Sequence, residues 1–339
     1  MLSTQMRPNR AAMNQAGDKI DWDGLRRIRE QFLDAKGPEG AYWSSLRLME
    51  SYDRTFAERI GWKWDAVFQE LKLRGWKPRP GPVTDWGCGT GMAARKFLEH
   101  AGTDGVDTLV LWDRVENAAK YATRRVSRFF PGVKTRIARQ APRKEPGVLL
   151  ISHVLNELDD EQLDELIQLA SKAESVIWVE PGTFDASRKL IDIRETLREH
   201  LQLVAPCTHQ AACGMLAKGN EPHWCHHFTQ PPSRIHQDPH WSRFVSEMNI
   251  DLGTLPYSFL AFDKVGLPPL ENGVRVIGHP RQYKGHCRLL SCRASGVGEL
   301  SLSATPDKQI FKEVKKERLF PLFQIEAEKE RITKITPVT

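Results

Sequence analysis

The chain has 339 residues and a formal net charge of +6, with 40% hydrophobic and 27% charged residues. These proportions describe an ordinary soluble globular protein, and the length predicts one sizeable core with appended segments. No run of eighteen apolar residues occurs, so the sequence offers no membrane-spanning helix.

The first 75 residues are predicted to be a helical lead-in that follows a short arm. Residues 1–17 contain no acid and carry Arg7 and Arg10. We interpret them as a disordered arm, with an organelle transit peptide as the alternative. Apolar residues then recur at helical spacing, and Gly75 closes the last helix. The predicted helices are 22–36, 41–58 and 62–73.

Short apolar runs alternate with helical patterns from residue 76 to residue 203, which is typical of parallel βαβ units. The sequence therefore predicts a doubly wound, Rossmann-like α/β core. The predicted strands are GPVTDWG around Val83, TLVLWD ending at Asp113, GVLLIS ending at Ser152 and SVIWVE ending at Glu180. The predicted helices are 92–100, 116–129, 161–171 and 184–203.

The first predicted strand turns into its helix through the motif DWGCGTG, residues 85–91. Glycines at such a turn allow the backbone to approach a ligand at the carboxyl edge of the sheet. Met92 occupies the place of the third glycine of a dinucleotide fingerprint, and the acid before G-x-G-x-G resembles S-adenosylmethionine-dependent methyltransferases instead. The residues expected to contact this cofactor are Asp85, Gly87, Gly89, Gly91, Asp113 and Ser152.

Asp113 ends the second strand, 26 residues beyond Gly87, where its carboxylate can accept hydrogen bonds from ribose hydroxyls. His153 and Glu157 follow the strand that ends at Ser152 and are the candidates for acid-base catalysis. Structural capping or cofactor lining is the other interpretation of this pair. Nucleic-acid enzymes that methylate amino groups carry a motif resembling Asn-Pro-Pro-Tyr here, and this chain does not.

Cys207, Cys213 and Cys225 fall within nineteen residues of a polar, loop-like stretch. In a chain without a secretory signal, clustered thiols more often hold a metal than form disulfides. The gaps of five and eleven residues do not match the paired spacing of zinc knuckles, which favours an iron-sulfur cluster and leaves zinc as the alternative. The possible fourth ligands are Cys287, Cys292, His209, His223, His226 and His227.

Taken in order, five short motifs resemble the methyltransferase-like small-ribosomal-subunit assembly proteins of mitochondria and their bacterial relatives. The motifs are DWGCGTG, ISHVLNEL, VEPGT, PCTHQAAC followed by HWCHHF, and YKGHCRLLSC. The resemblance implies a class I methyltransferase fold with a cysteine-rich insert and a [4Fe-4S] cluster. Its implied ligands are Cys207, Cys213, Cys225 and Cys292. The eleven residues between Cys213 and Cys225 are more than the family usually has.

The resemblance also implies binding to the small ribosomal subunit or its RNA, and neither DNA nor a membrane is expected as a partner. Residues 120–144 carry nine basic residues and no acid, and residues 273–339 carry 13 basic against 7 acidic residues. We expect phosphate contacts from segments 120–144 and 275–318. The expected compartment is the bacterial cytoplasm, with the mitochondrial matrix as the alternative.

We therefore expect a methyltransferase that uses S-adenosylmethionine and acts on small-subunit ribosomal RNA. The alternatives are an inactive assembly factor that keeps the fold and a small-molecule methyltransferase that contains zinc. The expected organisation is a lead-in at 1–75, the core at 76–203, the cysteine-rich insert at 204–240, last core strands at 241–305 and a charged tail at 306–339.

Overall fold

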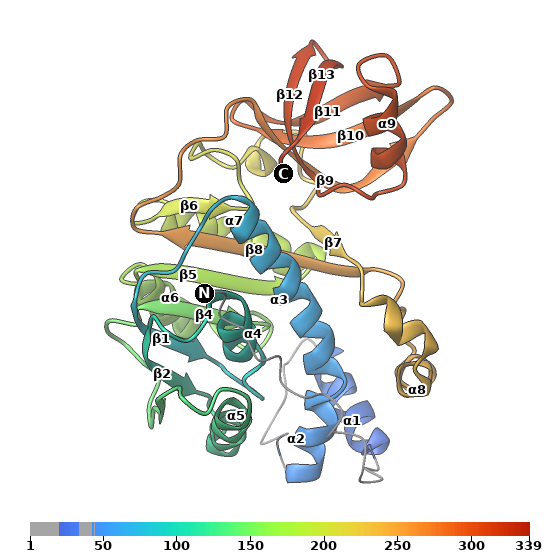
Figure 1. The fold of residues 1–339 in the computed structure, drawn as a ribbon. Helices are drawn as coiled ribbons and strands as arrows, with labels where there is room; N and C mark the ends of the chain where they lie inside the picture. Colours follow the sequence, from blue (N-terminus) through green and yellow to red (C-terminus); the bar gives the residue numbers. More distant parts are fainter. Residues whose placement is uncertain (1–19, 34–42, 44) are drawn as a thin grey trace, which may run out of the picture.

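A computed structural model describes residues 20–33, 43 and 45–339 and divides them between a helix-covered sheet and a β-barrel (Figure 1). The predicted arm with Arg7 and Arg10 lies outside the described residues. None of the helices in the described part of the chain has the length and apolarity needed to cross a bilayer.

The sheet has the strand order β3-β2-β1-β4-β5-β8-β6, and β7 pairs with the edge of β8. Strands β1 to β5 run parallel, whereas β8 runs antiparallel to β5 and β6. This order, with its antiparallel strand near one edge, confirms the predicted Rossmann-like methyltransferase fold. The strands are β1 (Gly81–Trp86), β2 (Val106–Trp112), β3 (Thr135–Ile137), β4 (Val148–Ser152), β5 (Ser175–Pro181), β6 (Gln202–Ala205), β7 (His227–Thr229) and β8 (Leu255–Asp263).

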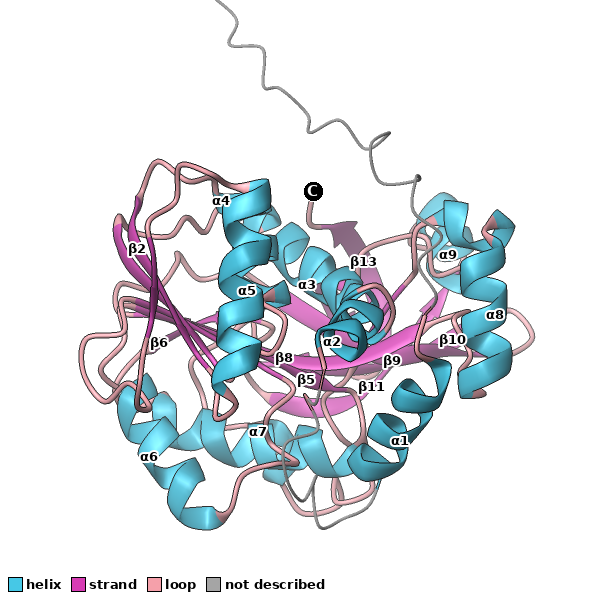
Figure 2. Ribbon diagram, turned by 90° about the horizontal axis from the view of Figure 1, so that it is seen from below, coloured by secondary structure: helices cyan, strands magenta, loops and turns pink. Residues whose placement is uncertain are grey.

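Helices cover both faces of this sheet (Figure 2). Apolar residues of α3, α4 and α5 fill one core with one side of the strands, and residues of α6 and α7 fill a second core on the other side. Both sides of the central strands are buried, which explains their nearly continuous apolar runs. These helices are α3 (Phe56–Leu73), α4 (Met92–Ala101), α5 (Glu116–Phe129), α6 (Asp160–Ala170) and α7 (Phe184–Leu197).

The lead-in is helical, but its break differs from the predicted one. The helices α1 (Trp22–Leu33) and α2 (Leu46–Asp53) precede α3, so the boundary lies near Thr55 rather than near Gly61. The Thr55 hydroxyl donates to the Ser51 carbonyl at 2.7 Å and helps to end α2. Gly61 lies inside α3 and does not break it. A Cβ at this position would come within 2.8 Å of the Met92 sulfur on α4, so the glycine allows the two helices to pack closely.

Residues 204–240 are mostly loop, as predicted, and carry β7 and two short 3₁₀ helices, η2 (Gly214–Leu216) and η3 (Ser233–Gln237). The following helix, α8 (Pro239–Met248), packs on the lead-in rather than on the sheet. Trp241 and Phe244 of α8 share a core with Leu25, Ile28 and Trp62. Only β8 of segment 241–305 joins the main sheet.

Segments 241–305 and 306–339 were expected to form the last core strands and a charged tail. Most of these residues instead form a closed five-stranded barrel. The tail is not a loose arm: Phe323, Ile325, Ile332 and Ile335 alternate with polar residues and point into the barrel core. The barrel consists of β9 (Gly273–Gln282), β10 (His286–Arg293), β11 (Gly296–Ser303), α9 (Lys308–Lys315), β12 (Leu322–Glu328) and β13 (Arg331–Pro337).

Candidate cofactor pocket and cysteine site

The three glycines of the first turn have left-handed backbone conformations, with φ of 68° at Gly87, 50° at Gly89 and 76° at Gly91. A Cβ at Gly91 would come within 2.9 Å of the Ala122 Cβ on α5, so this glycine allows α4 and α5 to pack closely. Among the described residues, a Cβ at Gly89 would approach Trp43 alone, at 3.9 Å. Gly89 thus leaves the backbone open to a ligand.

Two predicted acids hold this turn in place. Asp113 accepts the Gly89 N–H with Oδ2 and the Val115 N–H with Oδ1, both at 2.9 Å. Asp85 is fully buried and accepts the Ala94 N–H at 3.1 Å, whereas its Oδ1 has no partner among the described residues. Burial raises the pKa of Asp85 to about 7 and also raises the pKa of Asp113.

A cavity of about 720 Å³ opens over the glycine turn at the carboxyl edge of the sheet. Ser152 lines it and accepts a hydrogen bond from the Trp64 indole of α3 at 3.0 Å. The Thr90 hydroxyl also lies on the lining and is buried without a partner among the described residues. The predicted residues Gly87, Gly89, Asp113, His153 and Glu157 lie on the lining as well.

His153 lies on the lining of the cavity with a left-handed φ of 57°. Burial, with repulsion from Lys63 and Arg59, lowers the pKa of His153 well below its usual value, so the ring is neutral at pH 7. The His153 Nε2 atom has no partner among the described residues. Glu157 lies near the rim and pairs with Arg114 at 3.2 Å.

Two titratable residues of the cavity, Lys63 and Glu180, were not among the site residues predicted from the sequence. Burial lowers the pKa of Lys63 on α3 to about 7 and raises that of Glu180 to about 7. Glu180 accepts the N–H groups of Val154 and Leu155 at 3.0 and 3.3 Å, and thereby shapes the loop after β4. Glu180 is an acid at a strand end, so the criterion that selected Asp113 applies to it too. Lys63 carried no such signal.

The structure brings the predicted cysteines together although they come from distant segments. Cys213, Cys225 and Cys292 pack in one cluster with Met215 and Ile191. Burial raises the pKa of Cys213, of Cys225 and of Cys292, the last to about 12. Negative charge on the nearby Cys207 sulfur is the second cause of the rise in all three. All four cysteines are free thiols.

The alternation of side chains along β10 explains why Cys292, and not Cys287, lies beside the other three cysteines. Cys287 lies inside the barrel core with Leu289 and Leu302, whereas Cys292 faces outward toward the cysteine-rich loop. Cys287 and Cys292 are five positions apart, and this odd separation places the two side chains on opposite faces of β10. Cys292, rather than Cys287, therefore lies on the side of β10 that faces the cysteine-rich loop.

Charged groups of both signs surround the thiols. The Arg194 Nε–H donates to the Cys207 sulfur at 3.3 Å, whereas the Glu195 carboxylate accepts the Cys213 N–H at 3.1 Å and contributes to the raised pKa of Cys213. Arg194 and Arg275 both act against the rise in the pKa of Cys292. Within the described ranges, however, no three His, Cys, Asp or Glu side chains are grouped as metal ligands. The donor set suits a metal or cluster, and no metal geometry is observed.

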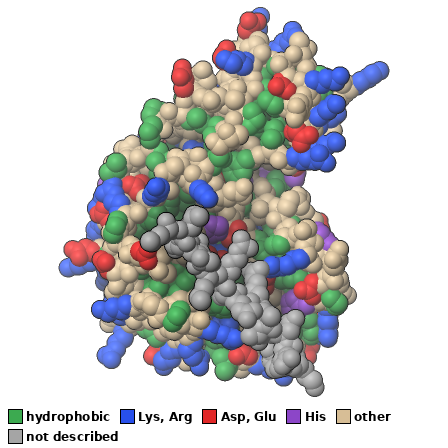
Figure 3. Space-filling view, viewed as in Figure 1, with side chains coloured by type: hydrophobic (Ala, Val, Ile, Leu, Met, Phe, Trp, Pro, Cys, Tyr) green, Lys and Arg blue, Asp and Glu red, His purple; other side chains and the backbone are tan. Residues whose placement is uncertain are grey.

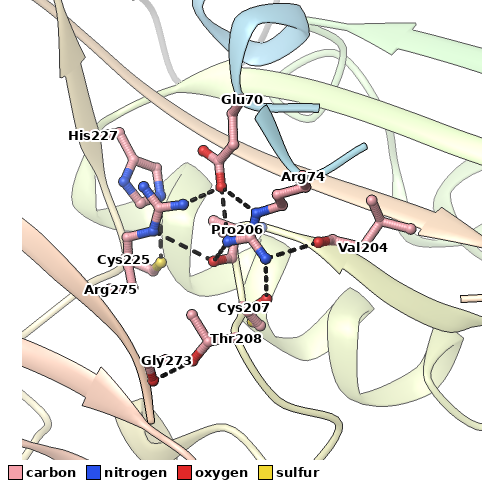
Figure 4. A network of polar contacts seen from close by, with 10 residues as sticks. All are labelled: Glu70, Arg74, Val204, Pro206, Cys207, Thr208, Cys225, His227, Gly273 and Arg275. Carbon is pink, nitrogen blue, oxygen red and sulfur yellow. Dashed lines mark hydrogen bonds and ion pairs between the residues drawn. The ribbon is translucent and has the colours of Figure 1, made fainter. Parts of the chain in front are cut away.

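A buried polar network joins α3 to the cysteine-rich loop and the barrel (Figure 4). Glu70 pairs with Arg74 of its own helix and with Arg275 of β9. Arg74 also donates to three carbonyl groups at 2.7 to 3.0 Å, and Arg275 donates to one of them at 3.4 Å. The carbonyls belong to Val204, Pro206 and Cys207. We call Glu70, Arg74 and Arg275 the Glu70 network, which fixes the backbone at the first cysteine.

The first predicted basic segment lies beside the cavity. Arg125 faces inward and pairs with the buried Asp53 at 2.8 Å, so it is unavailable for phosphate. Arg124 and Arg128 are exposed. A shallow groove follows at the end of β3, and the same loop reaches the cavity through Ala141. The basic residues of this groove are Arg136, Arg139, Arg143 and Lys144.

A family model described as mitochondrial small ribosomal subunit Rsm22 matches residues 80–318, which is more than half of the chain. No curated protein matches the chain. Among solved structures, a candidate RNA methyltransferase from Pyrococcus horikoshii is 10% identical, with a TM-score of 0.36, over 72% of this chain and 98% of the other.

The magnesium protoporphyrin IX methyltransferase of Synechocystis PCC 6803, solved with S-adenosylhomocysteine, is 14% identical, with a TM-score of 0.37. The match covers 72% of this chain and 94% of that one. The strand order and the family match support the methyltransferase fold.

Proposed function

The chain belongs to the Rsm22 family, and we propose that it binds S-adenosylmethionine in the cavity over the glycine turn and acts on or binds small-subunit ribosomal RNA during assembly. The observation that carries this proposal is the turn itself. Gly87, Gly89 and the strand-end acid Asp113 line one cavity at the carboxyl edge of the sheet, and Asp85 and Gly91 support the turn from outside the lining. This is where doubly wound folds bind their ligands.

The residues present suit the chemical groups of this cofactor, which supplies an activated methyl group when bound. Asp113 has acceptor capacity left for ribose hydroxyls, because each carboxylate oxygen accepts one backbone N–H. Glu180 lies on the lining and supplies negative charge for a sulfonium or an ammonium group, whereas Asp85 is buried outside the lining and adds negative charge beneath the turn. The Thr90 hydroxyl is a spare donor for the cofactor carboxylate.

A proton acceptor for methyl transfer is also proposed. His153 is neutral at pH 7 and its Nε2 has no partner among the described residues, so it is available to take a proton from an amino group. Lys63, whose pKa burial lowers to about 7, is a second acceptor in the same cavity. Glu157 serves cofactor or RNA positioning in this proposal, since it is paired with Arg114.

The ribosomal target is supported by charge and by the family description. The basic groove at residues 136–144 meets the cavity, so RNA phosphate bound there would bring a nucleotide to the cofactor. The description names the mitochondrial small subunit, which supports the second of the two expected compartments. Fractionation of cells that carry a tagged chain tests the compartment.

The proposal includes a [4Fe-4S] cluster held by Cys207, Cys213, Cys225 and Cys292. Its support is the convergence of these thiols beside Arg194 and Arg275, whose charges suit an anionic cluster. The proposed role is structural, tying the cysteine-rich loop to β10.

Cys287 supplies the matched control for the cluster, because it lies on the opposite face of the same strand. The protein should be purified without oxygen, and its visible spectrum and its iron, sulfide and zinc contents measured. Wild type and Cys287→Ser should be brown with iron and sulfide, whereas Cys292→Ser should lose both. Colourless wild type that contains zinc would favour the zinc alternative and contradict the cluster.

Crosslinking in cells, followed by methylation mapping, tests the target. A strain that lacks the gene is complemented with wild type or with Asp113→Ala, and the RNA crosslinked to the protein is sequenced. We expect small-subunit ribosomal RNA, with one site that loses methylation in the deletion strain and in Asp113→Ala. RNA that is bound and never methylated would favour the inactive assembly factor, and absence of ribosomal RNA would contradict the proposal.

A further inference from the structure

The connectivity of the C-terminal barrel identifies its class. Strands β9, β10 and β11 form an antiparallel meander, α9 leads to the hairpin of β12 and β13, and β12 closes the barrel on β9. The last strand, β13, runs parallel to β11 through the pair Ser301 and Arg331. A five-stranded barrel with this order and a helix before the fourth strand has the topology of the oligonucleotide-binding fold.

We infer that this barrel binds single-stranded RNA on the outer face of β10 and β11, an inference that rests on the proposed function for its RNA partner. Oligonucleotide-binding barrels use the outer face of their second and third strands, together with the loops that join strands 1 to 2 and 4 to 5. Here those strands are β10 and β11. The two loops are residues 283–285 and 329–330.

Register determines which side chains point outward. Leu289 and Leu300 are cross-strand partners inside the barrel core. Arg288 is paired with Arg281 on β9 and with Ser301 on β11, so these three side chains share the outer face.

One end of this face is covered and the other is free. Leu290 and Val297 pack against the cysteine-rich loop beside Met215. The end near residues 283–285 is exposed at Arg281, Arg288 and Lys284 within the described part of the chain. The Ser301 N–H donates to the Glu330 carbonyl at 2.7 Å, so the 329–330 loop borders the same exposed end. Both binding loops therefore flank the free part of the face.

The free end carries an aromatic platform. Tyr283 is 47% exposed, and its ring stacks on His286 with centroids 5.0 Å apart and planes 7° apart. The Tyr283 N–H donates to the His286 carbonyl at 2.9 Å, and Gly285 adopts φ of 82°, so the turn is held in a defined shape. An exposed ring in a fixed turn is suited to stack on an unpaired base.

The charge around this platform is positive. Arg281 and Arg288 both pair with Glu299, so two guanidinium groups face one carboxylate. Gln282 donates to the Lys315 carbonyl at 2.9 Å, which brings the lysine-rich end of α9 beside the face. Lys and Arg side chains gather over α9 and the adjoining strand ends (Figure 3). An aromatic ring amid arginines and lysines matches single-stranded RNA rather than an acidic protein, which offers no bases to stack.

Fluorescence anisotropy with a labelled twelve-nucleotide uridine RNA and the full-length protein tests the inference. We expect Tyr283→Ala and Arg288→Gln each to weaken binding about tenfold, and Tyr283→Phe to bind nearly as wild type. Lys334→Gln is the matched control, because Lys334 lies on β13 and pairs with Glu326 at 2.9 Å. A duplex of the same length should bind more weakly and should not respond to Tyr283→Ala.

Wild-type affinity in both Tyr283→Ala and Arg288→Gln would overturn the inference, as would a duplex that competes equally with the single strand. Circular dichroism melting of each variant establishes that it is folded. Calorimetry with S-adenosylmethionine on the same samples separates the two proposals. A wild-type protein that binds no S-adenosylmethionine would refute the proposed cofactor function without affecting the result for the barrel. Unchanged RNA affinity in the variants would refute only the proposed RNA-binding surface of the barrel.

Discussion

At the scale of single residues, the left-handed glycine Gly91 combines two constraints, its φ of 76° and its approach to Ala122. We expect Gly91→Ala to lower the free energy of unfolding by about 2–4 kcal/mol, from backbone strain plus overpacking. Gly102 is the control, because its φ is 84° and no atom of the described part of the chain, apart from its chain neighbours, lies within 4 Å of its ideal Cβ. Gly102→Ala should cost only about 1 kcal/mol in the same guanidinium titration. Equal losses would contradict close packing at Gly91.

Two buried acids, Glu180 on the cavity lining and Asp85 in the glycine turn beside it, predict a pH dependence of cofactor binding. Burial raises the pKa of Asp85 and of Glu180 to about 7. A cationic ligand favours the ionised carboxylates, so binding should release protons and the affinity for S-adenosylmethionine should fall as the pH drops from 8 to 6. The expected loss is about tenfold for each carboxyl that must ionise, per pH unit below its pKa.

Calorimetry at pH 6, 7 and 8 in buffers of different ionisation enthalpy measures both the affinity and the protons released. Asp85→Asn should bind more weakly at pH 8 and show a flatter profile. An affinity that stays constant from pH 8 to 6 in wild type would exclude ionisation of these carboxyls on binding.

Site residues could be predicted from the sequence where a short local motif identified them. DWGCGTG and the strand-end acid Asp113 could be identified from spacing alone, since a glycine turn and a following acid are properties of a short segment. Lys63 could not, because its lowered pKa arises from burial by elements that are distant in the sequence.

At the scale of elements, helix α3 positions the first cysteine through the Glu70 network. Arg74→Ala would remove three donors from buried carbonyls and one partner from Glu70. We expect a loss of about 3 kcal/mol in the free energy of unfolding and a lower iron content. Lys72→Ala is the control, because Lys72 lies two residues away on α3 and is exposed. Stability and iron content equal to those of the control would contradict a role in holding the loop.

The parallel strands of the core were predictable because each reads as an apolar run of its own. The barrel was not, although its strand β10 lies within the segment 241–305 in which strands of the core were expected. Its closure depends on pairing of β12 with β9 and of β13 with β11, and no local pattern shows such long-range pairs. The alternating charges of residues 306–339 belong to the outer face of β12 and β13 and to α9, and they resembled a surface tail.

At the scale of the whole molecule, the cysteine site lies where the α/β core meets the barrel. Cys207 follows β6 of the sheet, whereas Cys292 belongs to β10 of the barrel. The Glu70 network joins the same parts through α3 and β9. A cluster at these cysteines would therefore fix the RNA-binding face proposed for the barrel relative to the cofactor cavity.

Titration calorimetry of the full-length protein with S-adenosylmethionine tests the central claim, that the cavity over the glycine turn holds this cofactor. We expect one equivalent to bind to wild type. Asp113→Ala should weaken binding at least about tenfold, because it removes a charged hydrogen-bond acceptor. Asp107→Ala, exposed on the same strand, should leave binding unchanged. Wild type that binds no S-adenosylmethionine, or an Asp113→Ala variant that binds it as tightly as wild type, would contradict the account.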